Sequence, residues 1–300
     1  MTASFDIVVA GGGIAALSAG LTAARLGRST LVLAGDVLGG NLLSIESVQG
    51  YPGHAEGVPG YELVPAAQAM AAEAGAEFEM LPVLRVEGER SGWKVVTQEN
   101  EYIARSLIVA TGASPRKLAV PGAERLAGKG VSHCASCDGP LLRGARVAVV
   151  GGGDSAMQEA LTLASYVDRV VLLCRSAALA GQATYRQRVL SNPKIQTRFQ
   201  TEVSAIEGDA AVSAVRLASG ERLDVAAVFT YIGLQPNTTF LQDVVPLDAT
   251  GRIPSDGAMA TAKPGLFAAG LARAGSPGRA VASAGEGAAA AASAHRFLGA

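Results

Sequence analysis

The stretch ARVAVVGGGDSAMQEAL, residues 145–161, consists of an apolar run, three glycines and a segment whose apolar residues recur at helical spacing. A second apolar run, DRVVLLC at 168–174, follows it. This order predicts a strand, a glycine turn, a helix and a second strand. Together they make a βαβ unit of the length that dinucleotide-binding folds use. The stretch therefore predicts an α/β nucleotide-binding unit.

The N-terminal part of the chain contains the same arrangement, FDIVVAGGGIAA at 5–16, followed by a helical segment and by STLVLAG at 29–35. A glycine turn lets the backbone approach a pyrophosphate, and the helix N-terminus supplies N–H groups and a positive dipole end. Two such units imply two bound dinucleotides, or one dinucleotide and a vestigial site. The residues predicted to form the two sites are Gly11, Gly13 and Ala16 in the first loop and Gly151, Gly153, Asp154, Ser155 and Ala156 in the second.

The residues that end the second strand of each unit indicate which nucleotide is bound. An acidic residue there often binds a ribose hydroxyl, but the first unit has Ala34, with Asp36 only nearby. The first site is therefore not an ordinary NAD site. In the second unit Arg175 follows the strand, either as a contact for a 2′-phosphate or as a solvated surface charge.

The rest of the chain predicts how these units are organised. Strand-rich stretches with turn residues follow both units, at 83–111 and 196–232. Glycine-rich joints flank the second unit, so we predict that it is inserted into the first, with a strand at 266–270 and a helix beyond Gly285 returning to the first domain. The expected fold class is α/β, with two Rossmann-like dinucleotide-binding domains, each with a small antiparallel meander. Residues 1–113 plus 244–300 would form one domain and residues 114–243 the other.

Charge and hydropathy exclude several classes of partner. Lys and Arg number 25 and Asp and Glu 26, so no global charge attracts nucleic acid or an anionic membrane. The N-terminus lacks a basic region before its first apolar run, and the apolar C-terminal tail is too short to span a bilayer. We therefore expect no nucleic-acid or membrane partner and a cytoplasmic location. In a reducing compartment, three cysteines do not suggest a disulfide framework.

Two of the cysteines, Cys134 and Cys137, stand in the segment HCASCDG at 133–139. Zinc needs about four ligands, and the chain offers only this pair, one distant cysteine and three scattered histidines, so no metal site is expected. A redox dithiol needs only the pair. Asp138 is placed to act as a general acid for thiol–disulfide exchange, although a helix N-cap or turn role is an alternative. Two small buried residues remain the other interpretation of the cysteines.

Segments spread over nearly the whole chain resemble the low-molecular-weight bacterial thioredoxin reductase family. The block CASCDG is the most specific of them. The matching segments are GGGIAA (11–16), LGGNLL (38–43), the PG of QGYPG (49–53), VATGASPRKL (109–118), GVSHCASCDG (130–139), VAVVGGGDSAMQEAL (147–161), IGLQPN (232–237), PGLFAAG (264–270) and SAGEGAAAA (283–291).

The resemblance implies a homodimeric flavoprotein that binds FAD on its first and last segments and NADPH on its inserted domain. Electrons would pass from NADPH through the flavin to the cysteine pair, and on to a thioredoxin-like protein or a small disulfide, with the inserted domain rotating between the half-reactions. Cys137 would face the flavin, Cys134 would attack the substrate disulfide, and Asp138 would serve as the acid. The implied flavin contacts also include Gly40, Asn41, Thr111, Gly112, Gly270 and Arg279.

The chain departs from the family at several expected cofactor contacts. An aspartate that hydrogen-bonds the ribityl chain of FAD is replaced by Leu271, an asparagine by Gly50, and an Arg-Gln pair by Gly278-Arg279. On the NADPH side only Arg175 remains of three arginines, because Ser176 and Ala180 occupy the other two positions. Losing two charge-assisted contacts of roughly 1.5–3 kcal/mol each would weaken 2′-phosphate recognition, unless Arg186 or Arg188 substitutes.

Three hypotheses follow for the function. The first is an FAD-dependent disulfide reductase that uses a reduced nicotinamide. The second keeps the flavin and dithiol but uses another donor, such as ferredoxin, or runs in reverse as a dithiol oxidase. The third is a flavin-poor paralogue that acts as a binding subunit, although a scaffold has no need of the Cys134 and Cys137 spacing.

Overall fold

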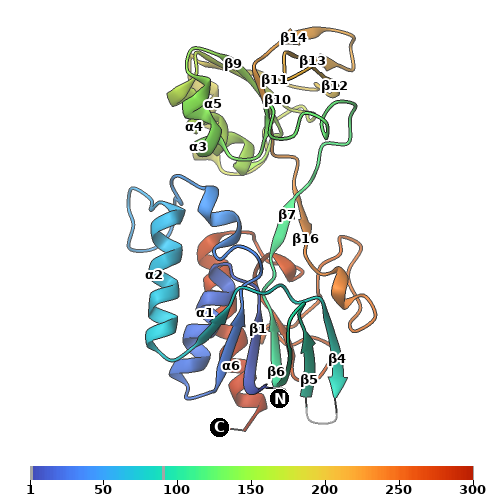
Figure 1. The fold of residues 1–300 in the computed structure, drawn as a ribbon. Helices are drawn as coiled ribbons and strands as arrows, with labels where there is room; N and C mark the ends of the chain where they lie inside the picture. Colours follow the sequence, from blue (N-terminus) through green and yellow to red (C-terminus); the bar gives the residue numbers. More distant parts are fainter. Residues whose placement is uncertain (1–2, 90–91, 300) are drawn as a thin grey trace. The chain divides into compact units, whose positions relative to one another are not determined.

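The computed structural model describes residues 3–89 and 92–299 of the chain (Figure 1). The chain divides into two compact units, one formed by Met1–Ser114 with Gln235–Ala300 and the other by Pro115–Leu234. Both contain a parallel sheet with helices packed on it, and the second is inserted into the first. The expected fold class is therefore confirmed.

The first unit is built on a sheet whose strands run in the order β3-β2-β1-β6-β5-β4, with β17 also paired to β6. Strand β1 lies centrally and pairs in parallel with β2 and β6, and its last four residues are fully buried. The strands are β1 (Ala3–Ala10), β2 (Thr30–Leu33), β3 (Glu77–Glu79), β4 (Arg85–Glu89), β5 (Gly92–Val96), β6 (Glu101–Val109) and β17 (Leu266–Ala268).

Strand β6 belongs to both parts of this sheet. It pairs in parallel with β1, where Val8 lies beside Leu107, and antiparallel with β5, where Trp93 lies opposite Ala104. The predicted meander at 83–111 is therefore not a separate layer but the continuation of the parallel sheet.

Helices α1 (Ile14–Arg25) and α6 (Ala280–Phe297) pack together on one face of this sheet, and α2 (Gly60–Glu73) packs against α1. The helix expected beyond Gly285 is present as part of α6, which begins five residues earlier, at Ala280. It packs closely on α1, since a Cβ on Gly287 would lie 2.0 Å from the carbonyl oxygen of Ala15. Glycine at this position is required by the contact between the two helices.

The second unit has a parallel sheet in the order β11-β10-β9-β15-β8 and a separate antiparallel sheet β12-β13-β14. The predicted strand-rich stretch at 196–232 is thus shared, because its first and last strands join the parallel sheet. The elements are β8 (Val131–Ser132), α3 (Ala135–Asp138), β9 (Arg146–Val150), α4 (Asp154–Tyr166), β10 (Arg169–Leu173), α5 (Ala183–Ser191), β11 (Ile195–Arg198), β12 (Val203–Glu207), β13 (Ala214–Leu217), β14 (Arg222–Asp224) and β15 (Ala227–Thr230).

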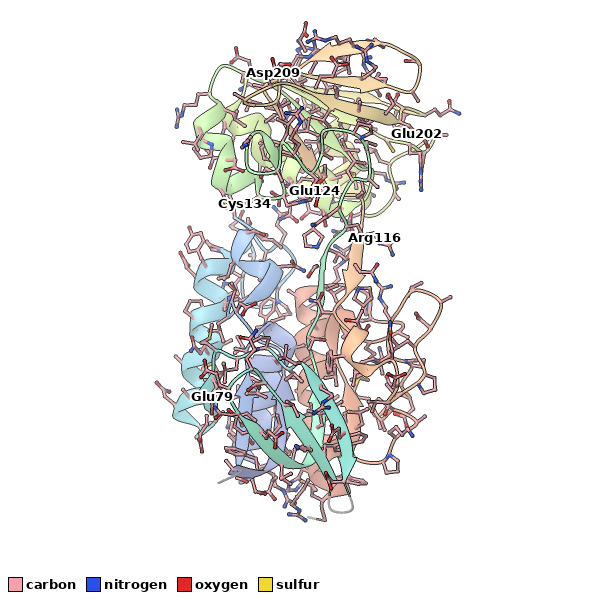
Figure 2. All side chains as sticks on the ribbon, turned by 45° about the vertical axis from the view of Figure 1, so that its right-hand side comes forward. Glu79, Arg116, Glu124, Cys134, Glu202 and Asp209 are labelled. Carbon is pink, nitrogen blue, oxygen red and sulfur yellow. A yellow bond between two sulfur atoms is a disulfide. The ribbon has the colours of Figure 1, made fainter. Side chains whose placement is uncertain are left out.

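Two short strands, β7 (Ala113–Pro115) and β16 (Leu234–Pro236), pair where the chain passes between the units. Just beyond β7, the N–H of Arg116 donates to the carbonyl of Gly233 at 3.0 Å (Figure 2). Residues 235–243, which the sequence assigned to the inserted domain, fold with the first unit. The reason is that Leu241 is fully buried in that unit's core.

Candidate active site

The first glycine loop leads from β1 into α1. A Cβ on Gly11 would lie 2.2 Å from the carbonyl oxygen of Ala110, and one on Gly12 would lie 2.5 Å from that of Ala34. Gly13, in contrast, has nothing within 4 Å of its Cβ position, and as the N-cap of α1 it provides no side-chain cap. The space beside Gly13 at the start of α1 is therefore open, which fits a pyrophosphate bound at a helix N-terminus.

Other predicted flavin contacts gather around this loop. The Cβ position of Gly40 is 4.0 Å from the Cα of Gly13, and the backbone N of Thr111 is 2.9 Å from the Cβ position of Gly11. The amide of Asn41 donates to the carbonyl of Ala113 at 2.7 Å. The structure therefore brings these residues to one place in the first unit.

Thr111 and Gly112 are further tied to Asn237. The hydroxyl of Thr111 donates to the Asn237 carbonyl at 2.7 Å, and the Asn237 N–H donates to the carbonyl of Gly112 at 3.1 Å. These bonds join the end of the first half of the unit to the start of its second half.

Gly270 also lies near the first loop, because its Cβ position is 3.0 Å from the Cβ of Ala15. Its N–H donates to the carboxylate of Glu286 at 2.7 Å, and Glu286 also pairs with Arg273. Sequence reasoning missed both charged residues. The available signal was a single glutamate in an otherwise alanine- and glycine-rich segment.

Three of the residues that replace expected flavin contacts, Leu271, Gly278 and Arg279, lie around the start of α6. Arg279 is exposed and is the N-cap residue of α6, without a side-chain cap bond. The Cβ position of Gly278 is 3.4 Å from a methyl group of Leu271. Their part in flavin binding stays a prediction.

The second glycine loop repeats the geometry of the first. A Cβ on Gly151 would lie 2.4 Å from the carbonyl oxygen of Tyr231, and one on Gly152 would lie 2.5 Å from the sulfur of Cys174. Gly153 has nothing within 4 Å of its Cβ position and starts α4 without a side-chain cap. This loop also fits a pyrophosphate at a helix N-terminus.

The residues after the second loop differ in exposure. Asp154 accepts the N–H of Gln182 at 2.8 Å, which ties the chain after β10 to the glycine loop. Ser155 is exposed, and Ala156 is fully buried, as is Ala16 in the first unit. Arg175 is exposed directly after the buried Cys174, and its contact with a nucleotide phosphate stays a prediction.

Cys134 and Cys137 are joined by a disulfide, with an S–S distance of 2.03 Å, at the start of α3 (Figure 2). Cys134 is the N-cap residue of α3, and its sulfur accepts the N–H of Cys137 at 3.2 Å. In the disulfide this sulfur carries no charge. In the reduced protein the same N–H would favour a thiolate at Cys134, whose role as the attacking thiol stays a prediction. Within residues 3–89 and 92–299, no group of three His, Cys, Asp or Glu side chains is arranged to hold a metal ion.

Asp138 ends α3 and precedes a 3₁₀ helix, η2 (Gly139–Leu142). Its N–H donates to the carbonyl of Cys134 at 3.2 Å, and it stands at the N-cap position of η2 without a side-chain cap bond. The predicted capping role is therefore not observed, and the general-acid role stays a prediction.

Two buried groups beneath α3 were not found from the sequence. Glu159, on α4, is 6 % exposed. Burial raises the pKa of Tyr231, and the carboxylates of Glu159 and Asp138 raise it further, whereas the N–H of Ala135 lowers it. Glu159 lies in a helix and Tyr231 follows a strand far along the chain. Nothing in the sequence indicates that the two side chains lie close together.

Comparison with known proteins gives a consistent result. The family model for pyridine nucleotide-disulphide oxidoreductases matches residues 5–287. The chain is 38 % identical to a thioredoxin reductase of Treponema pallidum (strain Nichols), over 91 % of each chain. It is also 38 % identical to a bifunctional thioredoxin reductase/thioredoxin of Mycobacterium leprae (strain TN), with 98 % of this chain and 66 % of that protein covered.

Among solved structures, the thioredoxin reductase of Lactococcus lactis superposes with a TM-score of 0.94 at 34 % identity, over 98 % of this chain and 99 % of that one. In the residues that the structure describes, no helix is long and apolar enough to cross a membrane. With two pyrophosphate-type loops and a disulfide in place, the chain belongs to the pyridine nucleotide-disulphide oxidoreductase family and is an FAD-dependent oxidoreductase.

Proposed function

We propose that this protein is a thioredoxin reductase, which passes an electron pair from a reduced nicotinamide through FAD to Cys134 and Cys137 and then to a protein disulfide. The disulfide at the start of α3 carries the proposal, because it is a reducible group next to a thiolate-stabilising N–H. Similarity to thioredoxin reductases over nearly the whole chain supports it.

We assign FAD to the first unit and NADPH to the inserted unit. Bound FAD would supply two-electron transfer between the nicotinamide and the disulfide. The open face of Gly13 and the N–H groups at the start of α1 would hold the pyrophosphate of FAD. Gly153 and α4 would do the same for NADPH, with Arg175 as the contact to its 2′-phosphate.

The chemistry of the cysteines follows from their geometry. Two electrons and two protons convert the Cys134–Cys137 disulfide into a dithiol. The Cys134 thiolate attacks the substrate disulfide, forming a mixed disulfide and releasing a substrate thiolate, which takes a proton from Asp138. Cys137, as a thiolate, then attacks the Cys134 sulfur, which restores the internal disulfide and releases the second substrate sulfur as a thiolate that takes a proton from water.

A protein rather than a small molecule is the proposed substrate. Leu141, four residues after Cys137 in the chain, is 82 % exposed, and we assign it as a contact for the protein substrate. The Mycobacterium leprae relative, named as a fusion with thioredoxin, supports a thioredoxin-like partner. A homodimer and a cytoplasmic location belong to the same proposal.

Turnover with separated half-reactions tests the proposal. The wild type should reduce thioredoxin at the expense of NADPH, and Cys137→Ser should abolish this turnover while leaving flavin reduction by NADPH intact. Turnover that survived in Cys137→Ser would refute the assignment of the cysteines. Leu141→Ser should raise the KM for thioredoxin and leave reduction of a small aromatic disulfide unchanged.

The second candidate uses the same flavin and dithiol with a donor other than NADPH, or runs as a dithiol oxidase. The observation in its favour is Ser176 and Ala180 in place of two phosphate-binding arginines. Anaerobic addition of NADPH distinguishes the candidates, because prompt bleaching of the flavin at micromolar NADPH excludes a lost nicotinamide site. The flavin-poor alternative is not retained, since the chain belongs to an FAD-dependent family whose pyrophosphate loop it preserves.

A further inference from the structure

A buried carboxyl and a buried hydroxyl lie beneath the redox helix α3. Glu159 is 6 % exposed, and the hydroxyl of Tyr231 is buried close to the Glu159 carboxylate and to the N–H of Ala135. Buried polar groups cost free energy unless they are well paired, so a group of this kind calls for an explanation. The thiol–disulfide steps described above use neither residue.

The packing of α4 places Glu159 beside Tyr231. Ala156, three residues before Glu159, lies on the same face of the helix. The Cβ position of Gly151 is 2.9 Å from the Cβ of Ala156 and 2.4 Å from the carbonyl oxygen of Tyr231. Tyr231 also packs against the hydrophobic cluster that contains Ala135, the residue after Cys134.

The next turn of α4 places Glu159 beside α3. Leu163, four residues after Glu159, again lies on the same face. One of its methyl carbons is 3.3 Å from the Cβ position of Gly139, the residue that follows Asp138. Glu159 is thus bracketed on its helix face by contacts to Tyr231 on one side and to the end of α3 on the other.

Electrostatics supports this placement. After burial, the Glu159 carboxylate is the strongest cause that raises the pKa of Tyr231, ahead of Asp138. The N–H of Ala135 acts on the same hydroxyl in the opposite direction. The hydroxyl therefore responds both to Glu159 and to the backbone next to Cys134.

We infer that Glu159 is a positioning residue for the dithiol, and that its buried charge acts through the Tyr231 hydroxyl on α3 to disfavour the thiolate of Cys134. The inference rests on the proposed function only in assigning Cys134 as the attacking thiol. Two groups would then act on the pKa of Cys134 in opposite directions. Glu159 disfavours the Cys134 thiolate, and the N–H of Cys137 favours it. The balance of the two would set the pH at which the reduced enzyme attacks a disulfide.

Other titratable groups packed around α3 must be held constant in a test. Asp138 lies on α3 itself, and the ring of Tyr166, on α4, is 2.9 Å from the Cβ position of Gly139. His133 precedes Cys134, and its Nδ1 is 3.0 Å from the carbonyl oxygen of Thr230. Glu159→Gln retains all of these groups and the shape of the side chain, and it replaces the carboxylate by a neutral amide.

The test measures the thiol directly in the FAD-loaded full chain. In a Cys137→Ser background, the rate at which iodoacetamide alkylates Cys134 is followed against pH by peptide mass spectrometry, which separates Cys134 from the buried Cys174. Glu159→Gln should lower the midpoint of this profile by about one pH unit. Glu202→Gln removes the same charge from an exposed position in the same unit and should leave the midpoint in place.

Tyr231→Phe tests the route. It should also lower the midpoint, by less than Glu159→Gln does, and the effect of Glu159→Gln should shrink when both changes are combined. An unchanged midpoint in Glu159→Gln or Tyr231→Phe overturns the inference, and additive shifts overturn the role of Tyr231. Alkylation needs neither electron donor nor disulfide substrate, so failure of this inference is distinguishable from failure of the proposed function.

Discussion

The guanidinium of Arg273 and the carboxylate of Glu286 lie 3.2 Å apart, and their side chains are only 14 % and 11 % exposed. Removing one partner of a buried ion pair leaves the other charge uncompensated. We expect Glu286→Ala to lower the free energy of unfolding by about 3 kcal/mol, measured by urea denaturation. Asp6→Ala, which breaks the more exposed pair with Arg105, should cost no more than about 1 kcal/mol. Equal losses would contradict the assignment of Glu286 as a buried partner.

Gly13→Ala should separate flavin binding from folding. The φ of Gly13 is −79°, which alanine adopts, and nothing lies within 4 Å of the new Cβ. The methyl group would project where the pyrophosphate is proposed to bind, so FAD affinity should fall at least about tenfold while Tm stays unchanged. The ratio of flavin to protein absorbance measures the first quantity. A fully flavin-loaded Gly13→Ala protein would argue against the assigned site.

Arg175→Gln should affect NADPH far more than NADH. If Arg175 is the contact to the 2′-phosphate, its loss removes about 1.5–3 kcal/mol of binding free energy for NADPH alone. Anaerobic titration of the flavin absorbance with each nucleotide gives the two affinities. Ser176→Arg should strengthen NADPH binding by a comparable amount. Parallel losses for both nucleotides would place Arg175 elsewhere in the site.

Asp138→Asn should slow thiol–disulfide exchange without slowing delivery of electrons to the enzyme. A general acid contributes about 100-fold or more to such a step, so thioredoxin turnover should fall by at least that factor. Stopped-flow reduction of the flavin by NADPH should keep its wild-type rate. Full turnover in the variant would leave Asp138 with a local structural role at the end of α3.

Tyr102 predicts a pH dependence of stability. Burial and the bond to Glu79 raise the pKa of Tyr102 from its ordinary value of 10.0 to about 12. The unfolded chain therefore releases this proton at lower pH than the folded protein does. The resulting stabilisation is complete below pH 10 and is lost as pH rises from 10 to about 12. Tyr102→Phe should flatten this part of the stability profile in denaturant titrations at pH 9 to 12, whereas an unchanged slope would point to other groups.

The strand–glycine–helix units were predictable because each is local in sequence: an apolar strand, a turn that only glycine fits, and an amphipathic helix. The start of α6 was not, since Gly285 and Gly287 lower helix propensity and only the contact of Gly287 with Ala15 shows why they are there. The same holds for β6, whose sharing between parallel and antiparallel partners depends on strands distant in the chain.

Some residues of the candidate site were also predictable from the sequence, and others were not. Cys134, Cys137 and the glycine loops follow spacing rules that the sequence shows directly. Glu159 and Tyr231 are separated along the chain and come together only when α4 packs between the second loop and α3. Glu286 is likewise distant from Gly270 in the chain, and only the fold brings its carboxylate to the Gly270 N–H.

The pairing of β7 with β16 has a consequence for how such a protein can be assembled. Because the N–H of Arg116 bonds the carbonyl of Gly233, the two ends of the inserted unit already lie together, as the ends of an independent domain would. Such a domain can be inserted, deleted or replaced during evolution by changes at only two junctions in the chain. In this protein the inserted unit contains both the disulfide and the second glycine loop, so the two would be inherited together.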